Sequence, residues 1–278
     1  MVIDYLVFEG GGIKGLAYIG VLEEMQKMCD ISSIQGFAGT SAGSIIATFL
    51  AVGMSVEQIK TILFNNDFSK LIPTNTWQVA IVYNIFNNYG YVDDNHFMRF
   101  LEKHLPKDYT LKELWDERQK ELIIVGSDLN TRTPVYFSYK NYPDIKISEL
   151  IRISMSIPFI FKPINYKGNL FTDGGSGDNY PLDYMKNTKK DSNVIGIRFL
   201  KRQDRYAINN IGDYINALLT VSVSNGHNYD NDPNSITIDV GNLDSLYFVI
   251  SHEKKRSLLA SGRDAYHHWY ESTKQCNT

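Results

Sequence analysis

A serine between two glycines is the first candidate for chemistry. Ser41 stands in the string Gly39-Thr40-Ser41-Ala42-Gly43, after an apolar run over residues 34–38 that predicts a strand. The apolar stretch over residues 45–52 follows and predicts a buried helix. In a sharp strand-to-helix turn, small residues two positions on either side let a serine oxygen project from the end of the sheet. The pattern predicts a nucleophile; the alternative is a tight turn with an N-capping serine.

A second glycine turn lies nearer the N-terminus. Gly10, Gly12 and Gly15 match G-x-G-x-x-G after a predicted strand over residues 2–8. A dinucleotide site would need an acidic residue at the end of the next strand, and Gly39-Thr40-Ser41 stands there instead. Consecutive glycines can instead offer backbone N–H groups to an oxyanion. We expect Lys14 to face solvent or to position this loop.

An acidic residue followed by two glycines is the candidate base. Asp173-Gly174-Gly175 follows a short run, Asn169 to Phe171, and is well placed to line a cleft. An EF-hand loop starting at Asp173 fails, because its twelfth position is Tyr184 where that loop needs Glu. The six histidines do not stand in distinctive turns, and we expect His267 and His268 to be exposed on a last helix.

These motifs together resemble the patatin-like phospholipase family. Residues 10–15 look like its G-G-G-x-[RK]-G oxyanion motif, residues 39–43 like its nucleophile turn, and residues 173–175 like its D-G-[GA] motif. The segment Arg152 to Pro163 is similar to the family's segment before that aspartate. The motif-bearing match runs from about Val2 to Pro181.

The resemblance implies hydrolysis of the acyl esters of phospholipids or other lipids, with no metal and no cofactor. Ser41 is then the nucleophile and Asp173 its direct base, without a histidine. An ordinary Asp has a pKa of about 3.9 and is therefore a weak base near neutral pH. For Asp173 to act as the base, we expect burial to raise its pKa. The implied oxyanion donors are Gly10, Gly11 and Gly12. The residues implied to support these motifs are Lys14, Gly15, Gly39, Gly43, Gly174 and Gly175.

The order strand, glycine turn, helix, repeated twice, predicts an α/β protein. With the resemblance, this implies a three-layer α/β/α patatin-like fold with a mainly parallel central sheet. We expect one catalytic domain over residues 1–278, with a cap or insertion at about 64–91, where Trp77, Phe86, Tyr89 and Tyr91 could line an apolar channel. Further strands are expected at 121–126, 134–139, 194–199 and 236–240. Further helices are expected at 13–28, 96–105, 148–155 and 208–225, and in a last segment capped by Ser251.

Charge and composition limit the classes of molecule that this protein is expected to bind. The formal net charge of −3 gives no support to nucleic-acid binding. The chain has two cysteines, no signal-peptide pattern and no apolar run near the ~20 residues of a membrane helix. An intracellular, soluble protein is the prediction, with any membrane contact peripheral. A loose basic set could meet anionic headgroups, although a solvated face is the favoured interpretation. It comprises Lys186, Lys189, Lys190, Arg198, Lys201, Arg202 and Arg205.

Two other functions stay open. An α/β-hydrolase would use a Ser–Asp–His triad ending in His227 or His252. That fold places its oxyanion loop and several strands before the nucleophile, whereas Ser41 comes early in this chain. The other alternative is a non-catalytic lipid-binding or scaffold protein.

Overall fold

The computed structural model describes residues 2–71, 84–92, 95–201, 207–209, 214, 217, 218, 221, 232–245 and 249–275. Its strands are β1 (Tyr5–Phe8), β2 (Gly36–Thr40), β3 (Gly90–Val92), β4 (Glu121–Asp128), β5 (Thr133–Phe137), β6 (Phe159–Phe161), β7 (Ile164–Tyr166), β8 (Asn169–Asp173), β9 (Val194–Phe199) and β10 (Ser235–Ile238). Its α-helices are α1 (Ala17–Met25), α2 (Ala42–Ala51), α3 (Val56–Asn65), α5 (Asn95–His104), α6 (Leu111–Arg118), α7 (Ile147–Ser154), α8 (Leu182–Thr188) and α10 (His252–Gln275). Short 3-10 helices are η1 (Gly12–Leu16), η2 (Ile31–Ser33), η3 (Phe68–Leu71) and η4 (Gly174–Ser176).

The central sheet follows the order β10-β9-β1-β2-β4-β8-β7, and β5 pairs with β4 outside this path. From β10 to β4 all neighbours are parallel. The pairs of β4 with β8, of β8 with β7 and of β4 with β5 are antiparallel. The expected mainly parallel sheet is therefore confirmed. In such a sheet the loops after the parallel strands gather at one edge, which is where ligand sites form.

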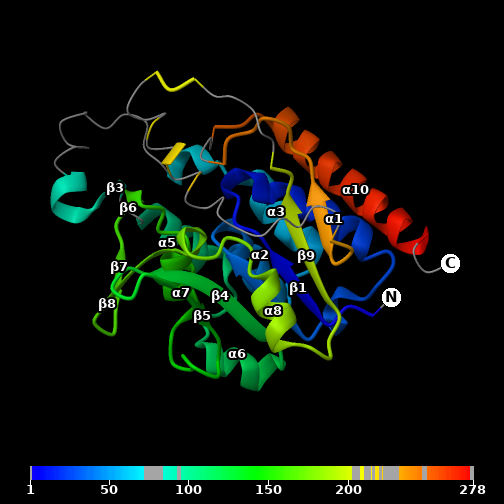
Figure 1. Cartoon of the computed structure of the whole chain (residues 1–278), viewed down its shortest axis with the longest axis horizontal. Helices are drawn as coiled ribbons and strands as arrows, with labels where there is room; N and C mark the ends of the chain where they lie inside the picture. The colour runs from blue at the N-terminus through cyan, green and yellow to red at the C-terminus, as the bar shows by residue number, and fades with distance from the viewer. Residues whose placement is uncertain are drawn as a thin grey trace.

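Successive side chains of a strand point to opposite faces of the sheet, so a strand of apolar residues has two apolar faces to bury. Helices cover both faces here. Along β1, Leu6 and Phe8 enter a large core with α1, α2, α3, α5, α7 and α10, whereas Tyr5 and Val7 enter a smaller core with α8. Figure 1 shows α1 and α10 side by side on one side of the sheet and α8 in front of it. This arrangement is the expected three-layer α/β/α fold.

Most expected elements are present with shifted ends. The single helix expected over residues 13–28 is instead η1 followed by α1. The Ser251 hydroxyl accepts a hydrogen bond from the Lys254 N–H at 3.1 Å, so it caps α10 as expected. The helix expected at 208–225 and the middle of the proposed cap, residues 72–83, fall almost wholly outside the described residues.

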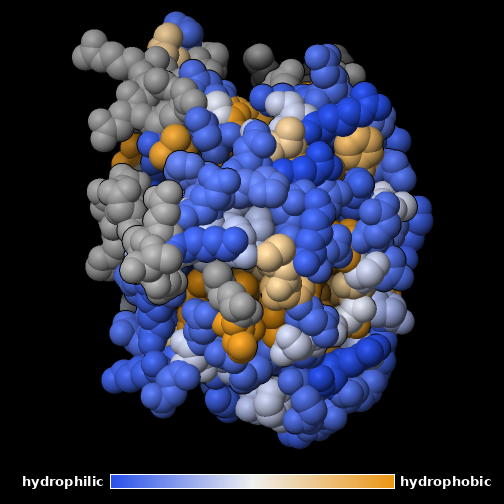
Figure 2. Space-filling model, turned by 90° about the vertical axis from the view of Figure 1, so that its right-hand side faces the viewer, coloured by the Kyte–Doolittle hydropathy of each residue, from blue (hydrophilic) through white to orange (hydrophobic). Residues whose placement is uncertain are grey.

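No helix within the described part of the chain is both long enough and apolar enough to cross a membrane. The face shown in Figure 2 is largely hydrophilic, with its apolar side chains in small separate groups.

Candidate active site

The turn that carries Ser41 is strained. Ser41 has φ 51° and ψ −125°, a backbone conformation that a non-glycine residue rarely adopts. Gly43 must be glycine, since a Cβ there would lie 2.5 Å from the Phe8 carbonyl oxygen. β2 therefore enters α2 through a turn pressed against the end of β1. This is the backbone form that a nucleophilic serine at a strand–helix junction requires.

Contacts from α7 and its end hold the turn. The Ser41 N–H donates to the Ser154 hydroxyl at 2.9 Å, and the Ser44 hydroxyl donates to the Ser41 carbonyl oxygen at 2.6 Å. The Ser41 hydroxyl lies 3.7 Å from the Met155 sulfur, which is a weak acceptor. Within the described part of the chain, the Ser41 side-chain oxygen thus has no strong partner that would compete with a base.

Asp173 ends β8 at the same edge of the sheet. The register pairs Thr40 with Val125 and Asp173 with the next residue of β4, Gly126. Asp173 Oδ1 accepts the Gly175 N–H at 2.7 Å. Asp173 Oδ2 is buried and accepts no hydrogen bond from the described part of the chain. An unpartnered carboxylate oxygen in a buried position is costly, and it is also free to take a proton.

Burial sets the proton affinity of this carboxyl. It raises the pKa of Asp173 to about 7, while the nearby Ser41 hydroxyl and the hydrogen bond from the Gly175 N–H act in the opposite direction. Ser41 follows β2 and Asp173 ends β8, so the two residues lie at the same edge of the sheet on either side of β4. A closed hydrogen bond is not formed, because the Ser41 oxygen points to Met155 and Oδ2 stays unpartnered. Apo sites often hold such pairs apart.

The first glycine turn lies directly beside Ser41. A Cβ on Gly10 would lie 3.2 Å from the Ser41 Cβ. The Gly10 N–H, however, donates to the Asn179 carbonyl oxygen at 2.9 Å. Of the three expected donors, Gly10 therefore has an N–H that already bonds another loop, which makes it less available to an oxyanion. The N–H groups of Gly11 and Gly12 donate to no acceptor among the described residues, so they are the remaining candidates.

Asn179 holds the glycine turn from both sides. Besides its carbonyl bond to the Gly10 N–H, its side-chain Nδ2 donates to the Gly10 carbonyl oxygen at 3.1 Å and to Glu9 Oε1 at 3.3 Å. Glu9 Oε2 in turn accepts the Phe199 N–H at 2.7 Å. Burial raises the pKa of Glu9, and the Phe199 N–H opposes that rise. Sequence reasoning assigned no role to Asn179, which follows Asp173 closely, just after η4.

Substituting Gly10 by alanine is expected to lower ester hydrolysis about 100-fold. The new Cβ would lie 2.2 Å from Asn179 Oδ1, so either the asparagine or the glycine turn must move. Misplacement of a donor loop by about 1 Å carries a loss of this size. The measurement is kcat/KM on a soluble ester. The double variant Gly10→Ala with Asn179→Ala removes the clash, and a single variant with full activity would contradict the placement of this turn beside the reaction.

The residues expected to support the motifs have mostly structural positions. Lys14 is half-buried rather than facing solvent, and burial lowers its pKa against the opposing charges of Glu9 and Asp244. Gly15 packs against the Ala42 side chain at the start of α2. Gly174 and Gly175 form the start of η4, which follows Asp173.

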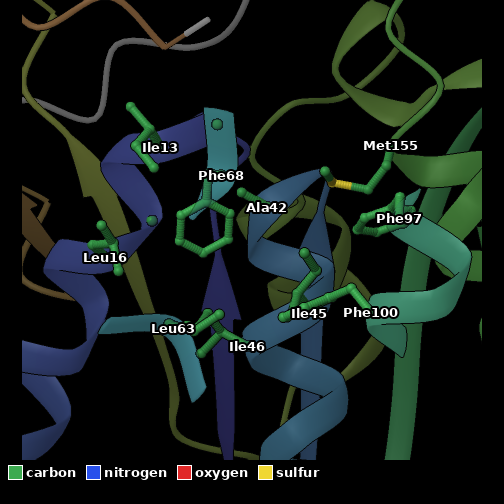
Figure 3. A pocket seen from close by; sticks show the side chains of 12 residues that line it. Ile13, Leu16, Ala42, Ile45, Ile46, Leu63, Phe68, Phe97, Phe100 and Met155 are labelled. Atoms are coloured by element: carbon green, nitrogen blue, oxygen red, sulfur yellow. The ribbon is translucent and has the colours of Figure 1, made fainter. Parts of the chain in front are cut away.

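A narrow apolar cavity of about 50 Å³ opens next to Ser41. Figure 3 shows the Phe68 ring between η1 on one side and Ala42 on the other, with Met155 beyond α2. None of the lining side chains carries a charge. The lining residues are Gly12, Ile13, Gly15, Leu16, Ala42, Ile45, Ile46, Leu63, Phe68, Phe97, Phe100 and Met155.

The aromatic residues expected to line a channel do not line this cavity. Phe86 is 81% exposed and Tyr89 63% exposed, while Tyr91 packs on a separate small core. Trp77 lies outside the described residues. Phe97 and Phe100, both on the inner face of α5, take their place together with Phe68. Sequence patterning shows that a phenylalanine on α5 faces inward, but it does not show which cavity it reaches.

The structure also places the alternative bases and the basic set. His252 is exposed at the start of α10, with its ring 5.4 Å from that of Phe64, and His227 lies outside the described residues. Arg198 is buried, Lys186 pairs with Asp232 at 2.7 Å, and Lys189 pairs with buried Glu121. Arg202 and Arg205 are outside the described residues. Three of the seven basic side chains are thus buried or paired with acidic residues of this chain. The seven residues therefore do not form one continuous basic patch that could meet anionic headgroups.

Comparison with known proteins places this chain in a family. A family model described as patatin-like phospholipase matches residues 6–186. An uncharacterised protein of Acanthamoeba polyphaga mimivirus is 32% identical over 226 residues, which cover 78% of this chain and 74% of that protein. A probable lipid hydrolase of Invertebrate iridescent virus 6 is 29% identical over 207 residues, covering 70% and 69%.

Solved structures agree in fold. VipD of Legionella pneumophila superposes with a TM-score of 0.65 at 19% identity, covering 97% of this chain and 67% of that one. ExoU of Pseudomonas aeruginosa, in complex with SpcU, gives a TM-score of 0.57 at 16% identity, and this chain spans about half of it, 52%. With the family model covering more than half of its length, this chain belongs to the patatin-like phospholipase family.

Proposed function

We propose that this protein hydrolyses fatty acyl esters of lipids through a Ser41–Asp173 pair. One observation carries the proposal: a serine in a strained strand–helix turn lies at the same sheet edge as a buried aspartate, one oxygen of which has no partner among the described residues, and its neighbours Ala42 and Met155 line an uncharged cavity. Strain of this kind persists where the surrounding structure enforces it, typically at active sites. The family and the lipid hydrolase relative support acyl hydrolysis as the reaction class.

Acylation begins with a turn of the Ser41 side chain from Met155 toward Asp173. Asp173 Oδ2 takes the hydroxyl proton while Ser41 Oγ forms a bond to the ester carbonyl carbon. The negative charge on the carbonyl oxygen is stabilised by the N–H groups of Gly11 and Gly12. Collapse of this tetrahedral intermediate breaks the ester bond, and the proton on Asp173 passes to the leaving alcohol.

Deacylation repeats these steps with water. Asp173, ionised again, takes a proton from the water that attacks the Ser41 ester, and the glycine N–H groups stabilise the second oxyanion. The second collapse releases the fatty acid and returns the proton to Ser41. A base with a pKa of about 7 is suited to both steps, because it is ionised near neutral pH and still binds a proton firmly.

The cavity supports an acyl chain as the part of the substrate that it binds. Its wall of leucine, isoleucine and phenylalanine side chains offers apolar contact and no partner for a charged headgroup. The headgroup or glycerol would then lie outside the cavity, toward the glycine turn. A substrate in a bilayer would bring the protein to the membrane surface.

The experiment that tests the proposal is release of labelled fatty acid from a panel of phospholipids and triacylglycerols, alongside soluble p-nitrophenyl esters. We expect turnover of at least one class, with the acyl label in the free acid. Absence of release from every substrate, with the folded protein still binding lipid, would favour the non-catalytic alternative.

A further inference from the structure

A buried lysine of the C-terminal helix reaches the segment that forms one wall of the cavity. Lys255 is 5% exposed and lies in the first turns of α10, beyond the part of the chain that the family model matches. Its ammonium donates to the carbonyl oxygens of Phe64 and Asn66 at 2.6 and 2.7 Å. These carbonyls stand at the C-terminal end of α3, where unpaired oxygens and the helix dipole favour a cation.

Two aromatic rings complete this contact. The Lys255 nitrogen lies 5.7 Å from the centre of the Phe64 ring and 5.5 Å from that of Phe68, within the range of cation–π attraction. Burial lowers the pKa of Lys255, and the charge of nearby Asp67 opposes this shift. The His252 ring also packs on Phe64. The start of α10 therefore holds the turn between α3 and η3 in place through hydrogen bonds and ring contacts.

The turn between α3 and η3 is flanked by two residues that line the cavity. Leu63 lies on the last turn of α3, just before the two carbonyls, and Phe68 lies just after them. Phe68 also packs near Phe100, with ring centres 6.4 Å apart. Because the carbonyls and the Phe68 ring both contact Lys255, a shift of the turn would move Leu63 and Phe68 together.

We propose that Lys255 is a positioning residue that holds the Leu63–Phe68 wall of the cavity and so sets the selectivity for acyl chain length. The inference rests on the proposed acyl hydrolysis. We expect an acetyl group on Ser41 to make little contact with this wall, and an octanoyl chain to pack against it. Loss of the lysine contacts therefore affects long acyl groups and spares short ones.

The test compares Lys255→Met with Arg256→Met, its exposed neighbour on α10. Methionine keeps an unbranched side chain but has no N–H to donate. We expect Lys255→Met to lower the ratio of kcat/KM for p-nitrophenyl octanoate over p-nitrophenyl acetate by about tenfold, with the acetate rate within about twofold of wild type. Arg256→Met should leave both rates unchanged. An unchanged ratio in Lys255→Met, or an equal loss on both esters, would overturn the selectivity role.

Hydrogen–deuterium exchange gives an answer that does not depend on turnover. In Lys255→Met, amides of residues 62–71 should exchange faster, while those of β1 and α2 keep their protection. Arg256→Met should match wild type throughout. If wild type hydrolyses neither ester, the proposed function fails, but the exchange arm still decides whether Lys255 holds the wall. Unchanged exchange at 62–71 would contradict the positioning role itself.

Discussion

Replacement of Ser41 by alanine is expected to abolish ester hydrolysis, with a loss of kcat of at least ~10³-fold. Without the hydroxyl no acyl-enzyme forms, and the glycine turn and cavity alone can only bind the ester. The fold should persist, because the contacts that hold this turn come from the Ser41 backbone, whose N–H and carbonyl bond to Ser154 and Ser44. The loss of activity would thus reflect chemistry and not unfolding.

A fluorophosphonate probe measures the same prediction directly. Intact-mass spectrometry should find one adduct on wild type and none on Ser41→Ala. Ser272→Ala, which replaces an exposed serine of α10, is the matched control and should be labelled like wild type. Stoichiometric labelling of Ser41→Ala would show that another side chain is the nucleophile.

The part of the site that could be predicted from the sequence is the part that local backbone geometry dictates. Gly39, Ser41 and Gly43 describe one turn, and the strand and helix around it follow from apolar patterning over a few residues. The same holds for β1, where a short apolar run is buried on both faces of a parallel sheet. The position of Asp173 at the end of β8 could also be predicted, because an acid before two glycines marks a turn at a strand end.

Contacts between distant segments could not be predicted in this way. The bond of the Gly10 N–H to the Asn179 carbonyl joins loops 169 residues apart, and it engages the N–H of one expected oxyanion donor. Phe68, Phe97 and Phe100 reach the cavity because α3, η3 and α5 pack over α2, which no local pattern specifies. Two missed helices did carry a local signal: α3 and α6 each begin with a capping box, Ser55 with Gln58 and Thr110 with Glu113.

Replacement of Asp173 by asparagine is expected to lower kcat by about 10³- to 10⁴-fold, because the amide cannot accept the serine proton. In wild type the base must be ionised, and burial raises the pKa of Asp173 to about 7. The value of kcat/KM should therefore be level above about pH 7 and fall about tenfold per pH unit below it. A pH–rate profile of a soluble ester measures both. Full activity in Asp173→Asn, or an acid limb near pH ~4, would contradict the assignment of the base.

The same substitution is expected to stabilise the fold, which separates a lost base from a damaged structure. A raised pKa means that native Asp173 binds its proton more tightly than the unfolded chain does, where the pKa is about 3.9. Its stabilising contribution is complete below about pH 4 and is lost as the pH rises through about 7.

At about pH 8 the buried charge of Asp173 therefore costs up to ~4 kcal/mol. Asparagine removes that cost while keeping an acceptor for the Gly175 N–H. The amide N–H₂ takes the place of Oδ2, which has no partner among the described residues, so it is itself left without an acceptor at a cost of ~1–3 kcal/mol. The net gain in the free energy of unfolding is therefore expected to be ~1–3 kcal/mol. Urea unfolding at about pH 8 and about pH 5.5 should show this gain shrinking at the lower pH, and a destabilised Asp173→Asn at the higher pH would show that Asp173 is not buried as a charge.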